Sequence, residues 1–318
     1  MNRLGNNLDK LLLLRNIVKE RHPSYMTCTM ICPKPTSSNT ISIIMTSHER
    51  AKQVYYTLHT IRNSTIKDIQ VILVDDSVND PIDPEQLCNI GIYVELIQIN
   101  RAMKFWVNPC VNYNIGFEFV KGGKVIIQNS EVCHVGDVIE YIQRTCNDNI
   151  YYSFDVKASR NFETNAFIYT NLSLTTRIYE HDLWETNNEL TWYQHTIHRN
   201  LNYHFLCSMT RTTFDHINGF SYDYAFGSWY DDNDFVMKIK WKNIEIRAIS
   251  NDTEHVGGIH LFHGYSHNIS DNSAYMSAKN LDLFHKKQQY IYRYQQYIEI
   301  SSYDSIHITD MFNTLNCA

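Results

Sequence analysis

The stretch "IQVILVDD", residues 69–76, decides the fold, because it is an almost unbroken apolar run that ends in two aspartates. Similar short runs lie at 41–45 ("ISIIM"), 93–99 ("YVELIQI") and 124–129 ("KVIIQN"), and helix-length segments lie near 50–63 and 108–120. Strands buried on both faces have continuous apolar sequences, and their alternation with helices is typical of a mostly parallel sheet. The sequence therefore predicts an α/β fold with helices on both faces of the sheet.

Two segments flank this alternating region. Residues 1–38 contain the amphipathic helix pattern "LDKLLLLRNIVKER", and the turn-rich connector "CPKPTSSNT" follows it. Residues 266–318 contain "KNLDLFHKKQQYIYRYQQYIEI", which predicts a long helix that packs on the main domain and contributes stability or an oligomer contact. We therefore expect an N-terminal helical appendage, one domain over residues 39–265, and a helical C-terminal extension.

Composition narrows the classes of function. The chain has 318 residues, of which 43% are hydrophobic, and its 11 Gly and 6 Pro are too few for a disordered or fibrous protein. A formal net charge of −6 leaves no general basic field, so we do not expect a nucleic-acid partner. The longest early apolar run, 11–14, is far shorter than the ~20 residues that cross a bilayer, so we expect no membrane span.

The eight cysteines show no repeated CxxC pairing, and no secretory leader pattern begins the chain. We interpret them as reduced thiols and expect a cytoplasmic location. Cys28 and Cys32 could bind a metal or form a bridge, but no second pair accompanies them.

Polar clusters follow three of the predicted strands: "TSHER" after 41–45, "DDS" after 69–74, and "NSEVCHVGD" after 124–128. Any one of them is typical of a turn. In parallel sheets, however, ligands bind at the carboxyl ends of the strands, where these clusters meet. No GxGxxG and no GxxxxGK[ST] follows any strand, so a nucleotide would have to be held by carboxylates and a metal.

A further acidic cluster lies in "FGSWYDDNDFVMKI", residues 226–239, at the head of a predicted helix. Aspartate in a first helical turn caps free amides, and one aspartate suffices for that. On a helix that starts near Tyr230, Asp232 shares the apolar stripe of Phe235, and we expect Asp231 and Asp234 on the flanks. The cluster by itself therefore leaves both interpretations open, capping and chemistry.

The order of these motifs resembles that of nucleotide-sugar glycosyltransferases of the GT-A fold, family-2-like. The nearest likeness is to the inverting branch with chondroitin-polymerase-type and β-1,4-galactosyltransferase-type modules, and it runs from about 41 to 265. The motifs that carry it are "TSHER", "VILVDDS", "WVNPCVNYNIGFEFVKGGKVIIQNSEVCHVGD", "WYQH", "GFSYDYAFGSWYDDNDF" and "GIHLFHG".

The resemblance implies a role for each acid of the helix head. The second acidic residue of the family's cluster falls on Asp232, which would be the general base that deprotonates the acceptor hydroxyl. Asp231 matches a position that contacts the acceptor. Inversion needs a base on one face of the sugar while the nucleoside diphosphate departs from the other face.

The resemblance also implies a divalent cation, Mn²⁺ or Mg²⁺, on the departing diphosphate. The family's D-x-D reads "QNSE" here, so Asn129 and Glu131 take the two positions and Glu131 is the candidate metal ligand. "GIHLFHG" places His260 at the position of the second ligand, with His263 beside it. Taken alone, these histidines could equally form a zinc site or be solvated imidazoles.

The donor site follows from the same likeness. Thr46, His48 and Arg50 would lie near the base and diphosphate, and Asp75 or Asp76 would accept a hydrogen bond from the uracil imide. The remaining candidates are Arg101 and Asn114 on the nucleotide-facing wall, and Trp192 and His195 in the sugar pocket. Packing and surface roles stay open for these four.

The sequence thus predicts a metal-assisted inverting glycosyltransferase that moves a sugar from a UDP-sugar to a carbohydrate or glycosylated acceptor. Two other classes remain: a catalytically silent GT-A domain that binds a glycan or a protein, and a metal-dependent hydrolase. Single hydroxyl orientations are recognised by pocket geometry, so no motif identifies the sugar or the acceptor.

Overall fold

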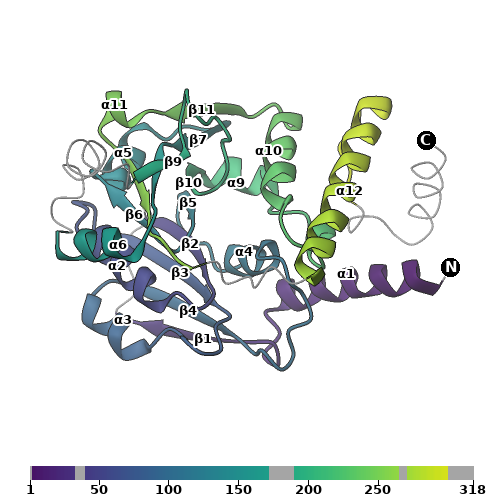
Figure 1. Ribbon diagram of the computed structural model, residues 1–318, viewed down its shortest axis with the longest axis horizontal. Coiled ribbons are helices and arrows are strands. Elements are labelled where there is room, and N and C mark those ends of the chain that lie inside the picture. Colours follow the sequence, from purple (N-terminus) through teal and green to yellow (C-terminus); the bar gives the residue numbers. More distant parts are fainter. Residues whose placement is uncertain (1, 33–39, 172–189, 265–270, 300–318) are drawn as a thin grey trace.

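The computed structural model describes residues 2–32, 40–171, 190–264 and 271–299, which form two β-sheets with helices packed against them (Figure 1). The strands are β1 (Met26–Ile31), β2 (Ile41–Ser47), β3 (Ile69–Asp75), β4 (Val94–Ile99), β5 (Lys124–Gln128), β6 (Val132–Val135), β7 (Ile150–Phe154), β8 (Val156–Ser159), β9 (Leu190–Gln194), β10 (Leu206–Thr210), β11 (Glu245–Ile249) and β12 (Gly257–His260).

The helices alternate with these strands over most of the described chain. They are α1 (Asn2–Glu20), α2 (Ala51–Arg62), α3 (Pro84–Ile90), α4 (Cys110–Phe117), α5 (Val138–Thr145), α6 (Phe162–Thr170), α9 (Arg211–Ile217), the 3-10 turn η3 (Tyr222–Tyr224), α10 (Asp231–Trp241), α11 (Asn251–Glu254) and α12 (Asp271–Tyr294). None of these helices combines the length and apolarity that a bilayer crossing requires.

The larger sheet has eight strands in the order β1-β4-β3-β2-β5-β10-β7-β11. Its centre, β4-β3-β2-β5, is parallel throughout, whereas β10 runs antiparallel to both of its neighbours. These four central strands are the four apolar runs of the sequence, so the predicted α/β fold with a mostly parallel sheet is confirmed. Their carboxyl ends lie at one edge, which brings the three polar clusters together.

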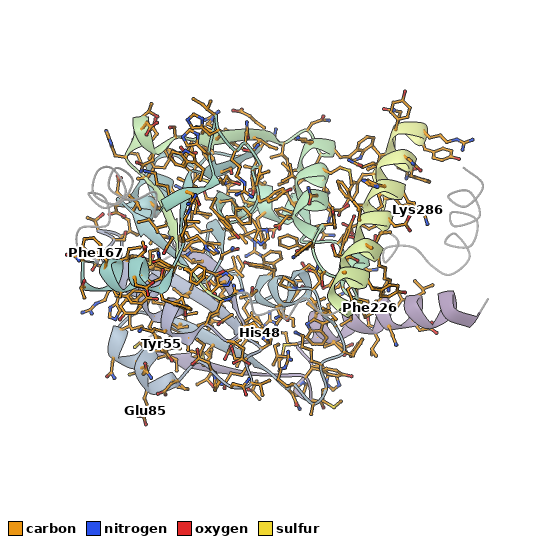
Figure 2. The ribbon with its side chains drawn as sticks, in the orientation of Figure 1. His48, Tyr55, Glu85, Phe167, Phe226 and Lys286 are labelled. Atoms are coloured by element: carbon orange, nitrogen blue, oxygen red, sulfur yellow. The ribbon has the colours of Figure 1, made fainter. Side chains whose placement is uncertain are left out.

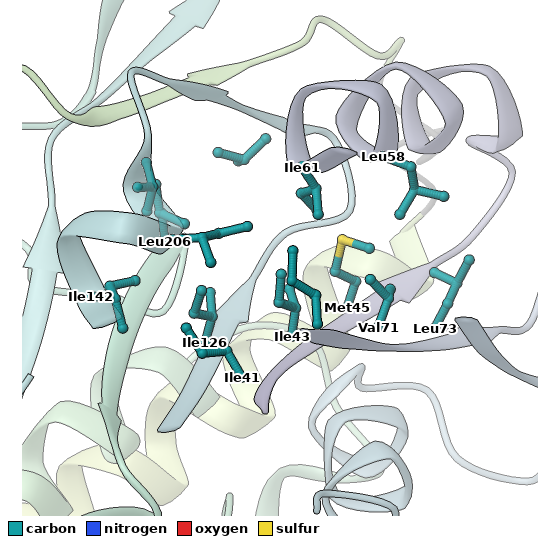
Figure 3. Close-up of a cluster of buried hydrophobic side chains, with 14 of the residues drawn as sticks. Ile41, Ile43, Met45, Leu58, Ile61, Val71, Leu73, Ile126, Ile142 and Leu206 are labelled. Carbon is teal, nitrogen blue, oxygen red and sulfur yellow. The ribbon is translucent and has the colours of Figure 1, made fainter. Parts of the chain in front are cut away.

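One face of the central sheet packs against α2, α3 and α5. Alternate residues of β2, Ile41, Ile43 and Met45, point to this face and belong to the same buried cluster as Leu58 and Ile61 of α2 (Figure 3). Each of these side chains is fully buried, and burial of an Ile or Leu side chain contributes about 1.5–3 kcal/mol. The apolar stripe of α2 therefore fixes the β2–α2 turn that carries His48 and Arg50.

The opposite face packs against α1, α4, α9 and α10. Ile44 of β2 and Ile72 of β3 point to it, because successive strand residues alternate between faces. Leu14 and Ile17 of α1 belong to the same cluster, and β1 pairs with β4 at the edge of the sheet. The predicted N-terminal helix thus forms, and it packs on the core of the domain together with a strand that the sequence pattern did not indicate.

A smaller sheet, β6-β12-β8-β9, lies beyond the carboxyl end of β5. β12 pairs antiparallel with β6 so that His260 lies opposite Val132, and the amide of Leu261 donates to the carbonyl of Glu131 at 2.9 Å. This pairing places the "GIHLFHG" segment beside "NSEVCHVGD" although 129 residues separate Glu131 from His260.

Candidate active site

The carboxylate of Asp76 is the centre of a charged cluster at the end of β3. It accepts from Lys104, from Arg101 at 3.4 Å and from Asn112 Nδ2 at 3.0 Å, and His48 Nδ1 lies 2.8 Å from its other oxygen. Burial alone would raise the pKa of Asp76, but the His48 contact and the Lys104 charge hold it well below its usual range. His48 (Figure 2) and Arg101 are 44% and 38% exposed, so the cluster reaches solvent through these two side chains.

Asp75, the neighbouring aspartate, has a different environment. Its oxygens accept from the amide and hydroxyl of Ser77 and from the amide of Ile82, so it closes the turn that follows β3. Burial raises its pKa despite these hydrogen bonds. The sequence offers both Asp75 and Asp76 as the acceptor for the uracil imide. In the structure, Asp76 is the one that faces the basic and partly exposed groups.

Glu131 lies at the centre of a second cluster, at the end of β5. Its Oε1 lies 2.5 Å from Arg50 Nη1, 3.1 Å from His260 Nε2 and 3.4 Å from His263 Nε2, and Ser130 Oγ donates to Oε2 at 3.0 Å. Burial would raise the pKa of Glu131, but the Arg50 charge and the two imidazoles hold it well below its usual range. The carboxylate is therefore ionised at neutral pH.

The donor atoms of Glu131, His260 and His263 lie within 4.8 Å of one another, which is compact enough to surround one divalent ion. Burial lowers the pKa of His260 although the neighbouring Glu131 carboxylate acts in the opposite direction, and a lowered pKa favours the neutral imidazole that binds metals. One carboxylate and two imidazoles suit Mn²⁺ and zinc better than Mg²⁺, which prefers oxygen ligands. The predicted ligands Glu131, His260 and His263 thus fit a divalent cation. Arg50 is paired with the Glu131 carboxylate as well.

The head of α10 holds three aspartates, and the residue at its N-cap position is Tyr230. Asp231 and Asp234 are 5% and 1% exposed, whereas the side chain of Asp232 is 25% exposed. The expected arrangement, with Asp232 inward and its neighbours on the flanks, is therefore reversed. The reason is that Asp231 shares a helical face with Phe235 and Lys238, which are both buried, so the inward face of α10 contains polar residues as well as apolar ones.

Asp231 is held by Asn108, whose Nδ2 donates to its Oδ1 at 3.0 Å. Burial, and next the charge of Asp232, raises the pKa of Asp231 to about 7. Asp232 Oδ1 is buried and lies 2.5 Å from Nδ1 of the buried His204, which leaves Oδ2 as the oxygen that can reach a ligand.

Two tyrosines connect the Asp232 side of the site with the Glu131 side. The Tyr193 ring packs on His260 with a centroid distance of 4.1 Å, and burial and then the charges of Glu131 and Asp232 raise the pKa of its hydroxyl. The Tyr113 ring lies 4.6 Å from His204, while its hydroxyl donates to the carbonyl of Gln128 at 3.0 Å. Tyr113 thus links the Asp232–His204 pair to the end of β5, while Tyr193 packs on His260.

The start of α4 connects all three clusters. Asn108 binds Asp231, Asn112 binds Asp76, and Tyr113 contacts both Thr46 and the residues that precede Glu131. Trp106 Nε1 donates to Asn112 Oδ1 at 2.8 Å and fixes the orientation of that amide. A single helical turn thus sets the spacing between the predicted nucleoside, metal and base groups.

Three other predicted residues have internal partners. Asn114 exchanges two hydrogen bonds with the backbone of Phe220, on the face of α4 away from Asp76. His195 is 2% exposed, and its Nδ1 accepts from the amides of Ile197 and His198 while its Nε2 lies 3.5 Å from Asp155. The Trp192 ring packs against this histidine in a tilted arrangement, with a centroid distance of 4.0 Å. These three side chains form packing contacts that do not include Asp76 or Glu131.

Asn129 lies at the edge of the site, where its Oδ1 is 3.5 Å from the Tyr113 hydroxyl. The site residues absent from the sequence prediction are Lys104, Asn108, Asn112, Tyr113, Tyr193 and His204. A signal for two of them existed in "VNPCVNYN", since helical spacing of four places residues 108 and 112 on one side and residue 114 on another. Nothing in the sequence distinguishes His204 from the other 14 histidines.

No protein-family model matches the chain, and no curated protein is similar to it in sequence. Solved structures are similar to it, and they are glycosyltransferases. S. aureus TarS 1–349 in complex with UDP-GlcNAc is 12% identical with a TM-score of 0.49, over 77% of this chain and 65% of that one. The mannosyltransferase PcManGT from Pyrobaculum calidifontis, in complex with GDP-Man and Mn²⁺, is 12% identical with a TM-score of 0.45, over 99% of this chain and 80% of that one.

The chain spans 43% of the longer TarS structure, which is 12% identical with a TM-score of 0.48.

Proposed function

We propose that the protein is an inverting glycosyltransferase that moves a sugar from a UDP-sugar to a hydroxyl of a carbohydrate or glycosylated acceptor. The observation that carries the proposal is a chain of contacts from Asp232 to the strand end that carries Glu131. Asp232 lies 2.5 Å from His204, whose ring lies 4.6 Å from that of Tyr113, and the Tyr113 hydroxyl donates to the carbonyl of Gln128. A free carboxylate oxygen on one side and a cation-binding group on the other are what an in-line displacement at an anomeric carbon needs.

Asp232 is the group that activates the acceptor. Its Oδ2 takes the proton of the acceptor hydroxyl as that oxygen attacks the anomeric carbon. The bond between this carbon and the diphosphate oxygen breaks on the opposite face, and UDP leaves with the electron pair. His204, 2.5 Å from Oδ1, orients the carboxylate so that Oδ2 is presented outward.

Glu131, His260 and His263 act on the leaving group. These three side chains would hold a divalent cation, which supplies positive charge to the diphosphate as the bond breaks. Arg50, whose side chain is 22% exposed and now paired with Glu131, lies where its guanidinium can also bind phosphate oxygens in bidentate fashion.

Asp76 is the group that would recognise the nucleoside. A buried, ionised carboxylate accepts the imide N–H of uracil, a donor that cytosine lacks. The partly exposed His48 and Arg101 are the partners that such a ligand can displace, while Lys104 and Asn112 remain in place and hold the carboxylate.

The test is the rate of UDP release from UDP-glucose, UDP-galactose and their N-acetylated forms, with Mn²⁺ and with a panel of acceptor sugars. With the donor that turns over, Asp232→Asn is expected to lower kcat by about 10²–10⁴ because the base is lost while the shape is kept. Asp215→Asn makes the same chemical change at a carboxylate on α9 that is 55% exposed, and it should leave kcat unchanged.

Full activity of a folded Asp232→Asn protein would show that the base is assigned to the wrong residue. The Glu131–His260–His263 set also resembles the ligands of a zinc hydrolase. Stoichiometric zinc in the purified protein, with turnover that needs no sugar nucleotide, would replace the transferase proposal by that function.

A further inference from the structure

We propose that helix α12 fixes the position of the two carboxylates at the head of α10, and that Asn280 is the positioning residue through which it acts. This inference rests on the proposed function, because that function gives Asp231 and Asp232 their roles. It adds a requirement for the C-terminal extension, which lies outside the region of family resemblance.

The turn segment 224–230, which leads into α10, has a strained backbone. Trp229 and Tyr230 both have positive φ angles, 63° and 67°. This left-handed region is sterically unfavourable for side chains with a Cβ, and consecutive aromatic residues adopt it only where their surroundings hold them there. Asp231 follows directly, so the conformation of these two residues sets the direction in which α10 begins.

Asn280 holds this turn at three points. Its Nδ2 donates to the carbonyl oxygens of Tyr224 at 3.2 Å and of Trp229 at 3.0 Å. Gly227 packs against the same amide, because a Cβ at residue 227 would lie 2.1 Å from Asn280 Oδ1. Asn280 is 2% exposed, so its hydrogen bonds are shielded from competing water.

Two further contacts come from the same face of α12. The carbonyl of Met276 accepts from the amide of Ser228 at 3.3 Å, and the ring of Phe284 stacks on Tyr230 with a centroid distance of 6.0 Å. Positions 276, 280 and 284 are each four residues apart, so they line one side of the helix. Three successive turns of α12 thus contact the segment 224–230.

Lys287 anchors this face of α12 to the catalytic helix. Its buried ammonium lies 2.9 Å from Asp234 Oδ1 on α10 and 3.2 Å from Asp223 Oδ2 in η3. A lysine that is 1% exposed between two carboxylates has little freedom to move, because any displacement leaves buried charges unpaired. The two helices lie beside each other in Figure 1.

The described contacts of Asn280 are all with the segment 224–230, and none is with Asp76 or Glu131. Loss of the Asn280 amide should therefore displace Asp231 and Asp232 while the nucleotide and metal groups stay in place. A positioning residue of this kind affects kcat and leaves donor binding unchanged.

The first experiment measures kcat, the donor KM and the calorimetric Kd of UDP for Asn280→Ala. We expect kcat to fall about 10- to 100-fold, since a displacement of about 1 Å at the reacting atoms can cost 10²-fold. The KM and the Kd should change less than about two-fold. Lys279→Ala, at the exposed neighbouring position, is the matched control and should match the wild type. An unchanged kcat in a folded Asn280→Ala protein overturns the inference.

The second experiment is a double-mutant cycle with Gly227→Ala. Alone, this change should lower kcat and the melting temperature, because its methyl group overlaps Asn280. In an Asn280→Ala background the overlap is gone, so Gly227→Ala should have little further effect on either quantity. Additive losses would contradict the contact on which the inference depends. Should Asn280→Ala not fold, Asn280→Ser, which keeps one donor, takes its place in both experiments.

The third measurement separates this inference from the proposed function. Amide hydrogen exchange of residues 227–233 should be faster in Asn280→Ala than in the wild type, while the strands of the central sheet keep their protection. Unchanged exchange in this segment overturns the inference whether or not the protein is active. If the wild type releases no UDP from any donor, but exchange is still faster in Asn280→Ala than in the wild type, only the proposed function is contradicted.

Discussion

At the scale of single residues, the buried carboxyl of Asp231 is expected to make stability depend on pH. Burial and the charge of Asp232 raise its pKa to about 7 in the folded protein, against 3.8 for an ordinary aspartate. The folded state therefore holds a proton that the unfolded chain has lost. This contribution to stability is complete below pH 4 and is lost as the pH rises through 7.

Asp231→Asn removes that loss, because an amide does not ionise and its oxygen can still accept from Asn108. The free energy of unfolding of the variant, relative to the wild type, should rise by on the order of 2–4 kcal/mol between pH 4 and pH 8. Urea unfolding at several pH values measures it, and Asp215→Asn should show no such trend. A constant difference across this pH range would mean that Asp231 is ionised in the folded protein.

Single residues also show how far the sequence determines the site. Glu131 and His260, which lie 3.1 Å apart, could be placed together because each lies in a motif with a recognisable order of residue types. The sequence predicts Asn114 as a site residue, but the asparagines that contact the aspartates are Asn108 and Asn112. Several asparagines occur close together, and only the orientation of α4 on the sheet distinguishes them. The role of His204 could not be predicted, because it depends on a contact with Asp232, which lies 28 residues further along the chain.

At the scale of elements, α4 sets the geometry of the site because it packs very closely on the sheet. Gly116 allows this approach, since a Cβ there would lie 2.8 Å from Ile44 Cγ2 and 3.3 Å from Val74 Cγ2. Gly116→Ala should push α4 outward and destabilise the protein by about 1–3 kcal/mol, as other overpacked cores are destabilised. The same shift moves Asn108 and Asn112, so the donor KM should rise.

Thermal unfolding and donor kinetics measure these two effects. Gly264→Ala is the control for stability, because a Cβ at residue 264 has no heavy atom within 4 Å and should leave the melting temperature unchanged. A Gly116→Ala protein as stable as the wild type would show that α4 has room to move.

The elements themselves were largely predictable. Apolar runs gave β2, β3, β4 and β5, because strands buried on both faces need such sequences. β1 was missed because its central residues are exposed at the edge of the sheet, so "MTCTMI" has no apolar periodicity. The smaller sheet was also missed, since its short strands, such as "VKAS" and "GGIH", contain no continuous apolar run.

At the scale of the whole molecule, the site is assembled from segments between residues 46 and 263, and its helix α10 is held by α12. The alternation of strands and helices predicts that the carboxyl ends of the central strands converge. It does not predict which side chains face one another across that edge, because those contacts depend on the packing of loops and of the second sheet.

The central claim is that Asp76, Glu131 and Asp232 belong to one site for a uridine diphosphate and a cation. Calorimetric titration of UDP with and without Mn²⁺ tests it most directly. We expect Mn²⁺ to tighten UDP binding about ten-fold or more in the wild type and in Asp232→Asn, and to have no such effect in Glu131→Gln. Failure of UDP to bind to the wild type, with or without Mn²⁺, would contradict the account.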